Sequence, residues 1–146
     1  EQSDEKRIGS YFHVLNDLER IGDHAENFYE IGEEMYQKKI LFSEQAQSKI
    51  RKMYEKIIEM FQIAKDAFEN FDKTQLPKLA TLENEVDMLK KQLTTSHFMR
   101  LAEGSCQIES SPYYSSAIAG LERVADHLVN VGYSILNPVG SQKELD

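Results

Sequence analysis

Apolar side chains recur at alternating spacings of three and four residues through almost the whole chain. This spacing gathers them on one face of an α-helix, because the helix completes a turn every 3.6 residues. No stretch alternates convincingly with the period of two that is typical of a strand. We therefore expect an all-α fold with helices near residues 4–38, 44–72, 75–103 and 112–136.

Helix-capping residues stand at the breaks between these stretches. Ser43, Thr74 and Ser111 precede the second, third and fourth helices, and a hydroxyl there accepts a hydrogen bond from the first turn. Gly104 follows the third helix and Asn137 the fourth, where they are expected to end the helices. The short connections predict an antiparallel four-helix bundle, in which the first and last helices are neighbours.

The first helix carries an apolar stripe that we expect to face the core. The stripe runs at helical spacing over more than 25 residues and includes two glycines. Its members are Ile8, Phe12, Leu15, Leu18, Gly22, Ala25, Tyr29, Gly32 and Met35.

Composition narrows the possible functions. The 146 residues suffice for a single domain, 1–146, with a core of its own. The 25 acidic and 17 basic residues give a net charge of −8, which argues against a nucleic-acid partner. Cys106 is the single cysteine, so no disulfide framework is expected. No apolar run is long enough to insert into a membrane, and the start at Glu1 suggests a fragment of a longer protein.

A ten-residue segment occurs twice. LERIGDHAEN, residues 18–27, recurs 103 positions later as LERVADHLVN, residues 121–130. Each copy has a Glu four residues before an Asp, a spacing that puts both carboxylates on one helix face, one turn apart. The four carboxylates are Glu19, Asp23, Glu122 and Asp126.

Four carboxylates brought together repel one another unless cations balance them. Oxygen ligands suit hard cations such as magnesium, manganese and iron. A single Glu-xxx-Asp pair is most often a solvated stripe, but two copies with six shared offsets favour a site. We predict that Glu19, Asp23, Glu122 and Asp126 bind divalent or ferric ions, namely iron, manganese, magnesium or zinc.

A third Glu-xxx-Asp pair, Glu83 and Asp87, lies on the third predicted helix. It lacks the flanking Leu-Glu-Arg and His-xx-Asn positions, so a solvated stripe is favoured over a ligand pair. It remains a candidate for additional ligands.

The motif also repeats a His and an Asn. His24 and His127 follow each Asp by one residue, about 100° around the helix, where packing or support of a ligand is favoured over direct ligation. Asn27 and Asn130 extend each face by one turn and offer an amide oxygen or a hydrogen bond.

The sequence lacks the common motifs of enzyme active sites. The chain has no nucleophile elbow, P-loop or HExxH. Ferritin-like di-iron sites use a His three residues after a Glu, whereas here the His follows the Glu by five. We expect no catalytic function.

The two segments LERIGDHAEN and LERVADHLVN resemble the paired Glu/Asp-xxx-Asp motifs of the PhoU family. The resemblance implies a helical bundle of two three-helix repeats and metal clusters on the motif faces, whose ligands fall on Glu19, Asp23, Glu122 and Asp126. It also implies a role in phosphate uptake or its regulation. The segment 82–93 resembles the penultimate helix of the family, which adds weight to Glu83 and Asp87.

The chain is shorter than a full member of the family, with four predicted helices instead of six. The missing helices would leave apolar surface that a second copy covers, so we expect a homo-oligomer, most simply a dimer. A similar arrangement forms the cytoplasmic tail of bacterial sodium/phosphate cotransporters. The resemblance thus implies a metal-binding regulatory module that contacts a phosphate transporter or its membrane portion, in the cytoplasm or tethered to the inner face of the membrane. The alternative is a metal-free helical interaction or dimerisation domain.

Overall fold

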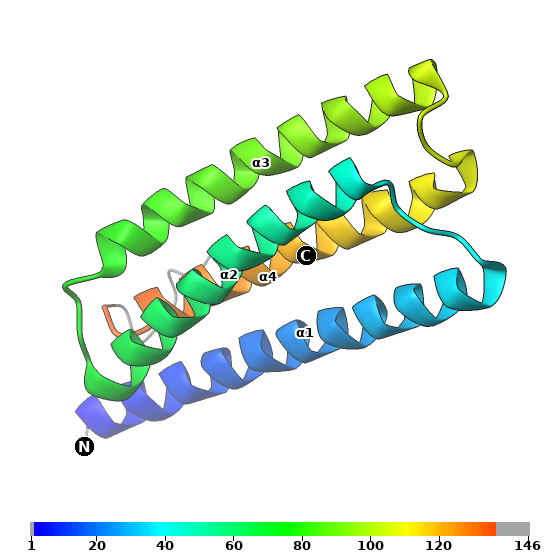
Figure 1. Cartoon of the computed structure of the whole chain (residues 1–146). Coiled ribbons are helices and arrows are strands. Elements are labelled where there is room, and N and C mark those ends of the chain that lie inside the picture. The colour runs from blue at the N-terminus through cyan, green and yellow to red at the C-terminus, as the bar shows by residue number, and fades with distance from the viewer. Residues whose placement is uncertain (1, 137–146) are drawn as a thin grey trace.

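Four long helices make up the protein, which is described here by a computed structural model covering residues 2–136. Consecutive helices run antiparallel (Figure 1), and no strand occurs within residues 2–136. The predicted all-α bundle is therefore confirmed. The elements are α1 (Gln2–Lys38), α2 (Glu44–Asn70), α3 (Leu76–Glu103), the 3₁₀ turn η1 (Ile108–Ser110) and α4 (Ser111–Tyr133).

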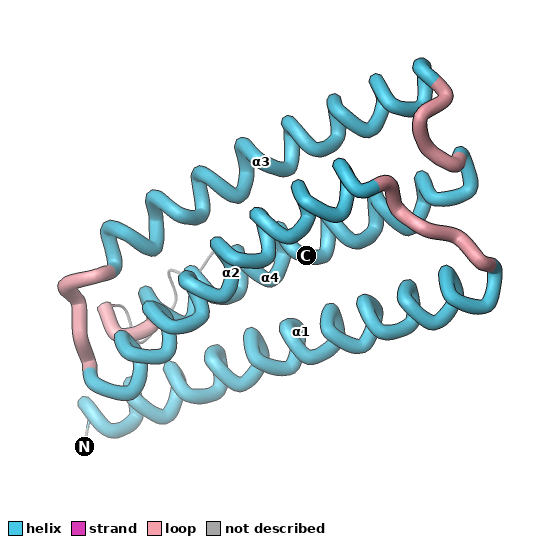
Figure 2. Tube along the Cα trace, in the orientation of Figure 1, coloured by secondary structure: helices cyan, strands magenta, loops and turns pink. Residues whose placement is uncertain are grey.

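The central helix is α4, which packs against α1, α2 and α3. The helices α2, α3 and α4 surround the main apolar core, whereas α1 lies along α4 at one side of the bundle (Figure 2). Between residues 2 and 136, no helix is long and apolar enough to cross a membrane. The largest fully buried apolar side chains are Tyr114, Met53, Met60, Leu79, Leu93 and Leu128.

Most of the apolar stripe of α1 does not face the core, contrary to the sequence-based expectation. Phe12 is 68% exposed and Leu15 is 60% exposed. Of the nine stripe residues only Met35 is buried, and the buried side of α1 otherwise includes Val14 and Asp17. The reason is topological: α1 packs mainly on the single helix α4, and one neighbour covers only a narrow side of a helix.

Of the predicted helix caps Ser43 and Thr74, the structure confirms the first and not the second. Ser43 caps α2 as expected, because its hydroxyl accepts a hydrogen bond of 3.2 Å from the N–H of Ala46. Thr74 does not cap α3, whose N-cap is Gln75. The backbone N–H and the hydroxyl of Thr74 instead donate to Oδ1 of Asp72, at 2.9 and 2.6 Å. The connection between α2 and α3 therefore closes as a turn held by an aspartate side chain.

The remaining predicted ends concern α3 and α4. Gly104 ends α3 in the left-handed region, with φ of 70°, as expected. The chain enters α4 through η1, so Ser110 is the N-cap and makes no side-chain capping bond. Ser111 instead shares a 2.7 Å hydrogen bond with Nε2 of His97 on α3. The predicted stop at Asn137 lies outside the described residues.

Candidate functional site

Two Glu-xxx-Asp pairs meet along the contact between α3 and α4. Each pair stands beside buried apolar residues of its own helix, so packing of the two helices brings the carboxylates to a common groove. The groove has a volume of about 610 Å³. Its lining residues are Glu83, Asp87, Lys90, Lys91, Thr94 and Thr95 of α3 and Glu122 and Asp126 of α4.

The carboxyl group of Asp126 is the most perturbed group of this groove. Burial raises its pKa, and so do a hydrogen bond with Glu83 and the negative charges of Glu83, Asp87 and Glu122, to about 7. A hydrogen bond between two carboxyl groups requires that one of them holds a proton. The groove therefore concentrates more negative charge than it can carry fully ionised at neutral pH.

One lysine offsets part of this charge. Nζ of Lys90 lies 3.1 Å from Oε1 of Glu122, in an ion pair that is only partly exposed. Sequence reasoning missed Lys90, although it follows Asp87 by three residues and Glu83 by seven and so lies on the same face of α3.

The donor set of the groove is all oxygen, which suits hard cations. Within residues 2–136, however, no group of three or more His, Cys, Asp or Glu side chains is arranged to hold a metal ion. The hydrogen bond of Asp126 with Glu83 and the ion pair of Lys90 with Glu122 already engage carboxylates of this groove. The carboxylate oxygens of the groove are suitable ligands for a cation. Binding would require the present hydrogen bond and ion pair to rearrange.

The first motif pair lies elsewhere. Glu19 and Asp23 are exposed on α1 and do not line the groove between α3 and α4. The structure therefore joins the second motif pair to Glu83 and Asp87, the pair that sequence reasoning ranked lower.

The repeated His and Asn face the contact between α1 and α4. Nδ1 of His127 lies 2.8 Å from Oδ1 of Asp17, and Nδ2 of Asn130 donates to the same oxygen at 3.3 Å. All three side chains are buried. Oδ2 of Asp17 has no hydrogen-bond partner in the part of the chain that the structure describes. This network ties the two motif helices together through polar groups.

The other copy of the motif contributes to the same contact. The ring of His24 lies 6.0 Å from the ring of His127, between centroids. Burial lowers the pKa of His24, and its neighbours His127 and Arg123 lower it further. Nδ2 of Asn27 donates to Oγ of Ser116 on α4 at 3.4 Å. None of the four repeated His and Asn residues lines the acidic groove.

Sequence reasoning also missed Asp17. It lies three residues after Val14 and four before Ile21, so it continues a second line of α1 at helical spacing that ends in His24. That line, and not the more apolar stripe beside it, faces α4. The sequence did indicate a buried polar contact here, because Asp17 lies at helical spacing between the apolar residues Val14 and Ile21.

Comparisons with known proteins identify the family of the chain. The family model described as PhoU domain matches residues 50–135, more than half of the chain. A phosphate-specific transport system accessory protein PhoU homolog from Deinococcus radiodurans is 26% identical over 130 residues, which are 89% of this chain. The chain spans 60% of the length of that relative. No solved structure matches the chain. The matched segment contains both helices of the acidic groove, and the chain belongs to the PhoU domain family.

Proposed function

We propose that this chain is a metal-binding regulatory module of phosphate transport, which acts by protein contact on a phosphate transporter or its membrane portion. Two comparisons support the transport role: the chain belongs to the PhoU domain family, and its relative from Deinococcus radiodurans is named as a phosphate-transport accessory protein. In this proposal the chain is not an enzyme, and it works in the cytoplasm at the inner face of the membrane.

The acidic groove carries the metal-binding part of the proposal. Burial and the charges of three neighbouring carboxylates raise the pKa of Asp126 to about 7. A bound cation would add positive charge to that of the two lysines, Lys90 and Lys91, that line the groove. Its expected ligands are Glu83, Asp87, Glu122 and Asp126, and the candidate ions are iron, manganese, magnesium and zinc.

The side chains of the groove have defined tasks in this proposal. Asp126 gives up its proton to become a ligand, and Lys90 turns away from Glu122, so cation binding is linked to proton release. Glu19 and Asp23 remain proposed ligands of a second site on α1. Because both are exposed, that site needs further oxygen ligands from water or from a partner chain.

Thermal unfolding of the purified chain tests metal binding. An ion that binds only the folded form stabilises it by about 2.7 kcal/mol at a hundredfold excess over the dissociation constant. We expect at least one of the four metals to raise the melting temperature of the wild type, and Asp126→Asn to remove most of that increase. Asp66→Asn, an exposed aspartate of α2, is the matched control and should respond like the wild type.

Three outcomes separate the alternatives. Loss of the response in Asp126→Asn alone supports the groove, whereas loss in Asp23→Asn assigns binding to the first motif. If no metal shifts the wild-type melt, the second candidate function holds, a metal-free interaction domain. One observation favours this candidate. Between residues 2 and 136, no three or more His, Cys, Asp or Glu side chains are arranged to hold a metal ion.

Phosphate uptake tests the transport role separately. Cells that lack this protein should take up phosphate at an altered rate when external phosphate changes, and the wild-type gene should restore normal uptake. If metal binding serves regulation, Asp126→Asn should fail to restore it, while Asp66→Asn should succeed. Unchanged uptake in the deletion strain would contradict a regulatory role.

A further inference from the structure

Seven of the nine stripe residues of α1 follow a heptad repeat. Apolar or small residues occupy the a and d positions through four consecutive heptads, and every one of them is exposed to solvent. A sustained a/d repeat is typical of a helix that packs along a second helix in a left-handed coiled coil. The a positions are Ile8, Leu15, Gly22, Tyr29 and Tyr36, and the d positions are Tyr11, Leu18, Ala25 and Gly32.

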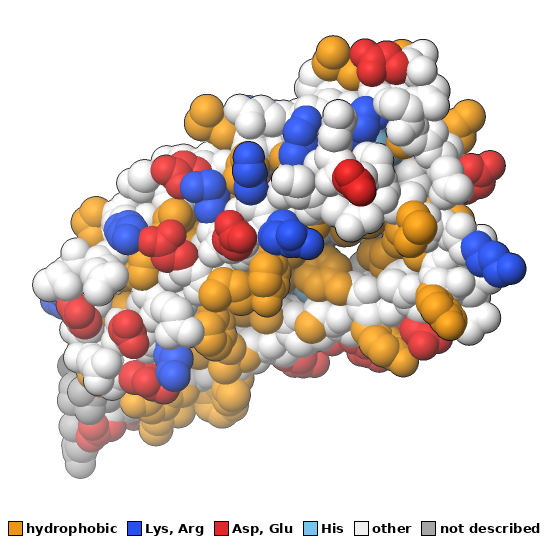
Figure 3. Space-filling view, in the orientation of Figure 1, with side chains coloured by type: hydrophobic (Ala, Val, Ile, Leu, Met, Phe, Trp, Pro, Cys, Tyr) orange, Lys and Arg blue, Asp and Glu red, His pale blue; other side chains and the backbone are white. Residues whose placement is uncertain are grey.

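The exposed apolar surface continues from α1 onto α2. Tyr54, Ile58 and Phe61 of α2 are each 42% to 52% exposed and lie on one helix face, four and three residues apart. A hydrophobic band follows the space between α1 and α2 in Figure 3. At the end of this band where α1 begins, the rings of Tyr11 and Phe68 are 5.9 Å apart between centroids. The two exposed faces therefore form one continuous surface.

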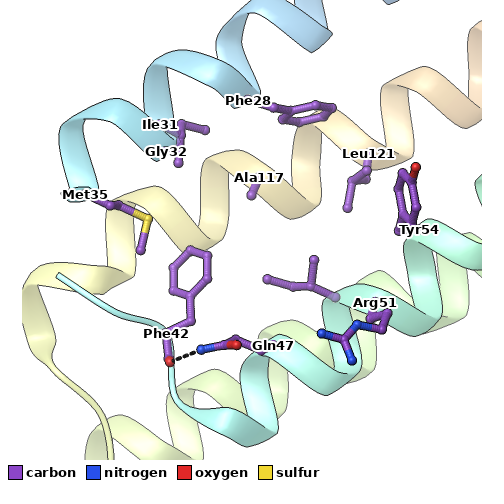
Figure 4. A pocket seen from close by; sticks show the side chains of 11 residues that line it. Phe28, Ile31, Gly32, Met35, Phe42, Gln47, Arg51, Tyr54, Ala117 and Leu121 are labelled. Carbon is purple, nitrogen blue, oxygen red and sulfur yellow. Dashed lines mark hydrogen bonds between the residues drawn. The ribbon is translucent and has the colours of Figure 1, made fainter.

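A groove of about 540 Å³ hollows the other end of this surface. Phe28 and Gly32 of α1 form one wall, Tyr54 and Arg51 of α2 form the other, and Leu121 of α4 lies at the floor (Figure 4). The groove is predominantly apolar.

The exposed area is sufficient for a stable interface. Ten large apolar side chains, 42% to 82% exposed, belong to the surface. Aromatic side chains have roughly 150–250 Å² each, so ten half-exposed side chains amount to on the order of 800 Å², which is about what each partner buries in a stable complex. The ten are Ile8, Tyr11, Phe12, Leu15, Leu18, Tyr29, Tyr36, Tyr54, Ile58 and Phe61.

We propose that the occupant of this surface is α1 of a second copy of the chain, lying parallel to the first. Glycines inside a long helix weaken it unless another backbone comes close. A Cβ atom at Gly22 or Gly32 would meet nothing within 4 Å. In a parallel pair, each glycine faces the same glycine of the other copy, so the two helix axes approach closely along the stripe.

The parallel direction follows from the position of the neighbouring helices. Both α4 and α2 lie on the same flank of the stripe, since Val14 of that flank packs in the core and Tyr11 contacts Phe68. A twofold axis of an antiparallel pair keeps both copies' α2 and α4 on one side of the paired helices. A twofold axis along the helices places them on opposite sides, so that each copy's α2 and α4 have more room.

Charge complementarity supports the same arrangement. Acidic residues occupy three successive e positions beside the stripe. Arg51 lines the groove on α2, and Lys65, four residues after Phe61, continues the exposed face of α2 by helical spacing. In the parallel pair, the e positions of the second α1 face α2, so that carboxylates approach these cations at the rim. In the antiparallel pair they would face away from α2. The acidic e positions are Glu19, Glu26 and Glu33, and the e position of the first heptad is Phe12.

Disulfide cross-linking measures both the pairing and its direction. In a Cys106→Ser background, Leu15→Cys places one thiol at an a position, next to its counterpart only in a parallel pair. We expect oxidation to convert most of this variant into covalent dimers. Arg20→Cys, exposed at an f position, is the control and should stay largely uncoupled. A non-covalent dimer in which Leu15→Cys fails to cross-link would overturn the parallel arrangement.

The oligomeric state of the chain tests the occupant itself. Light scattering of the wild type should give twice the 16.9 kDa of one chain. Leu15→Glu with Leu18→Glu should weaken the dimer at least a hundredfold and give the monomer mass, while its circular dichroism stays helical, because both residues lie outside the core. The matched control, Asn16→Glu with Arg20→Glu, should remain dimeric. A wild type that stays monomeric at high concentration overturns the proposal and assigns the stripe to a different polypeptide segment.

Discussion

Nδ1 of His127 lies 2.8 Å from Oδ1 of Asp17, across the contact between α4 and α1, and both side chains are buried. Asn130 donates a second hydrogen bond to the same oxygen. Apolar contacts alone would tolerate sliding of α1 along α4, whereas these hydrogen bonds form at one register only. The His and Asn of the repeated motif therefore position the two motif helices relative to each other.

Asp17→Ala should lower the free energy of unfolding by about 1.5–3 kcal/mol. The substitution removes the acceptor of two buried hydrogen bonds and leaves His127 and Asn130 without their partner. Urea unfolding in a chelating buffer measures the change. Asp23→Ala makes the same chemical change at an exposed position of the same helix and should stay within about 0.5 kcal/mol of the wild type. Equal effects of the two substitutions would mean that the buried network does not stabilise the fold.

The sequence pattern was sufficient for the all-α fold and for the helices whose apolar stripe has neighbours on both sides. The stripes of α3 and α4 are buried, as in Leu79 and Leu128, because two or more helices cover each of them. The stripe of α1 has the same spacing but is exposed at Leu15. Periodicity identifies which residues can face a partner, but it does not show whether this chain supplies that partner.

The candidate site shows the same limit at the level of single residues. The motif pointed to Glu122 and Asp126, but their neighbours Glu83 and Asp87 come from a helix without the motif, so only packing identifies them. Thr74 has good capping chemistry, yet Asp72 binds its hydroxyl and its N–H first. Both cases depend on competition between neighbouring groups, which spacing along the chain does not encode.

Asp126 should make the stability of the metal-free protein fall as the pH rises from about 4 to about 7. Its pKa in the fold is about 7, above the ordinary value of 3.8, so in this range the folded form holds a proton that the unfolded chain has lost. The stabilisation is complete below pH 3.8 and is lost as the pH passes through 7.

Melting temperatures with a chelator present measure this effect. Asp126→Asn cannot ionise, so the difference between wild type and variant should move against the wild type as the pH increases across this interval. A difference that stays constant from pH 4 to pH 8 would show that Asp126 has an ordinary pKa.

Lys90→Gln should destabilise the metal-free protein slightly and increase its response to metal. Partly exposed ion pairs contribute about 0.2–1 kcal/mol, and removal of Lys90 also leaves the carboxylate of Glu122 without its cation. A bound cation then relieves more repulsion than in the wild type. Lys78→Gln breaks the exposed pair with Glu59, whose atoms are 2.7 Å apart, and is the control. It should leave the metal-induced shift of the melting temperature unchanged.

Gly132→Ala should destabilise the protein by about 1–3 kcal/mol, the usual cost of overpacking a core. A Cβ atom at Gly132 would lie 2.5 Å from Cδ2 of Leu79 and 3.6 Å from the backbone of Ala64. Leu79 is fully buried and has little room to move, so α4 would have to shift away from α2 and α3. Gly22→Ala, at a position with open space, should instead stabilise the dilute monomer by about 0.5–1 kcal/mol, because alanine favours a helix over glycine. Chemical unfolding of both variants decides the matter: if Gly132→Ala is as stable as the wild type, α4 does not pack as closely against α3 as the structure places it.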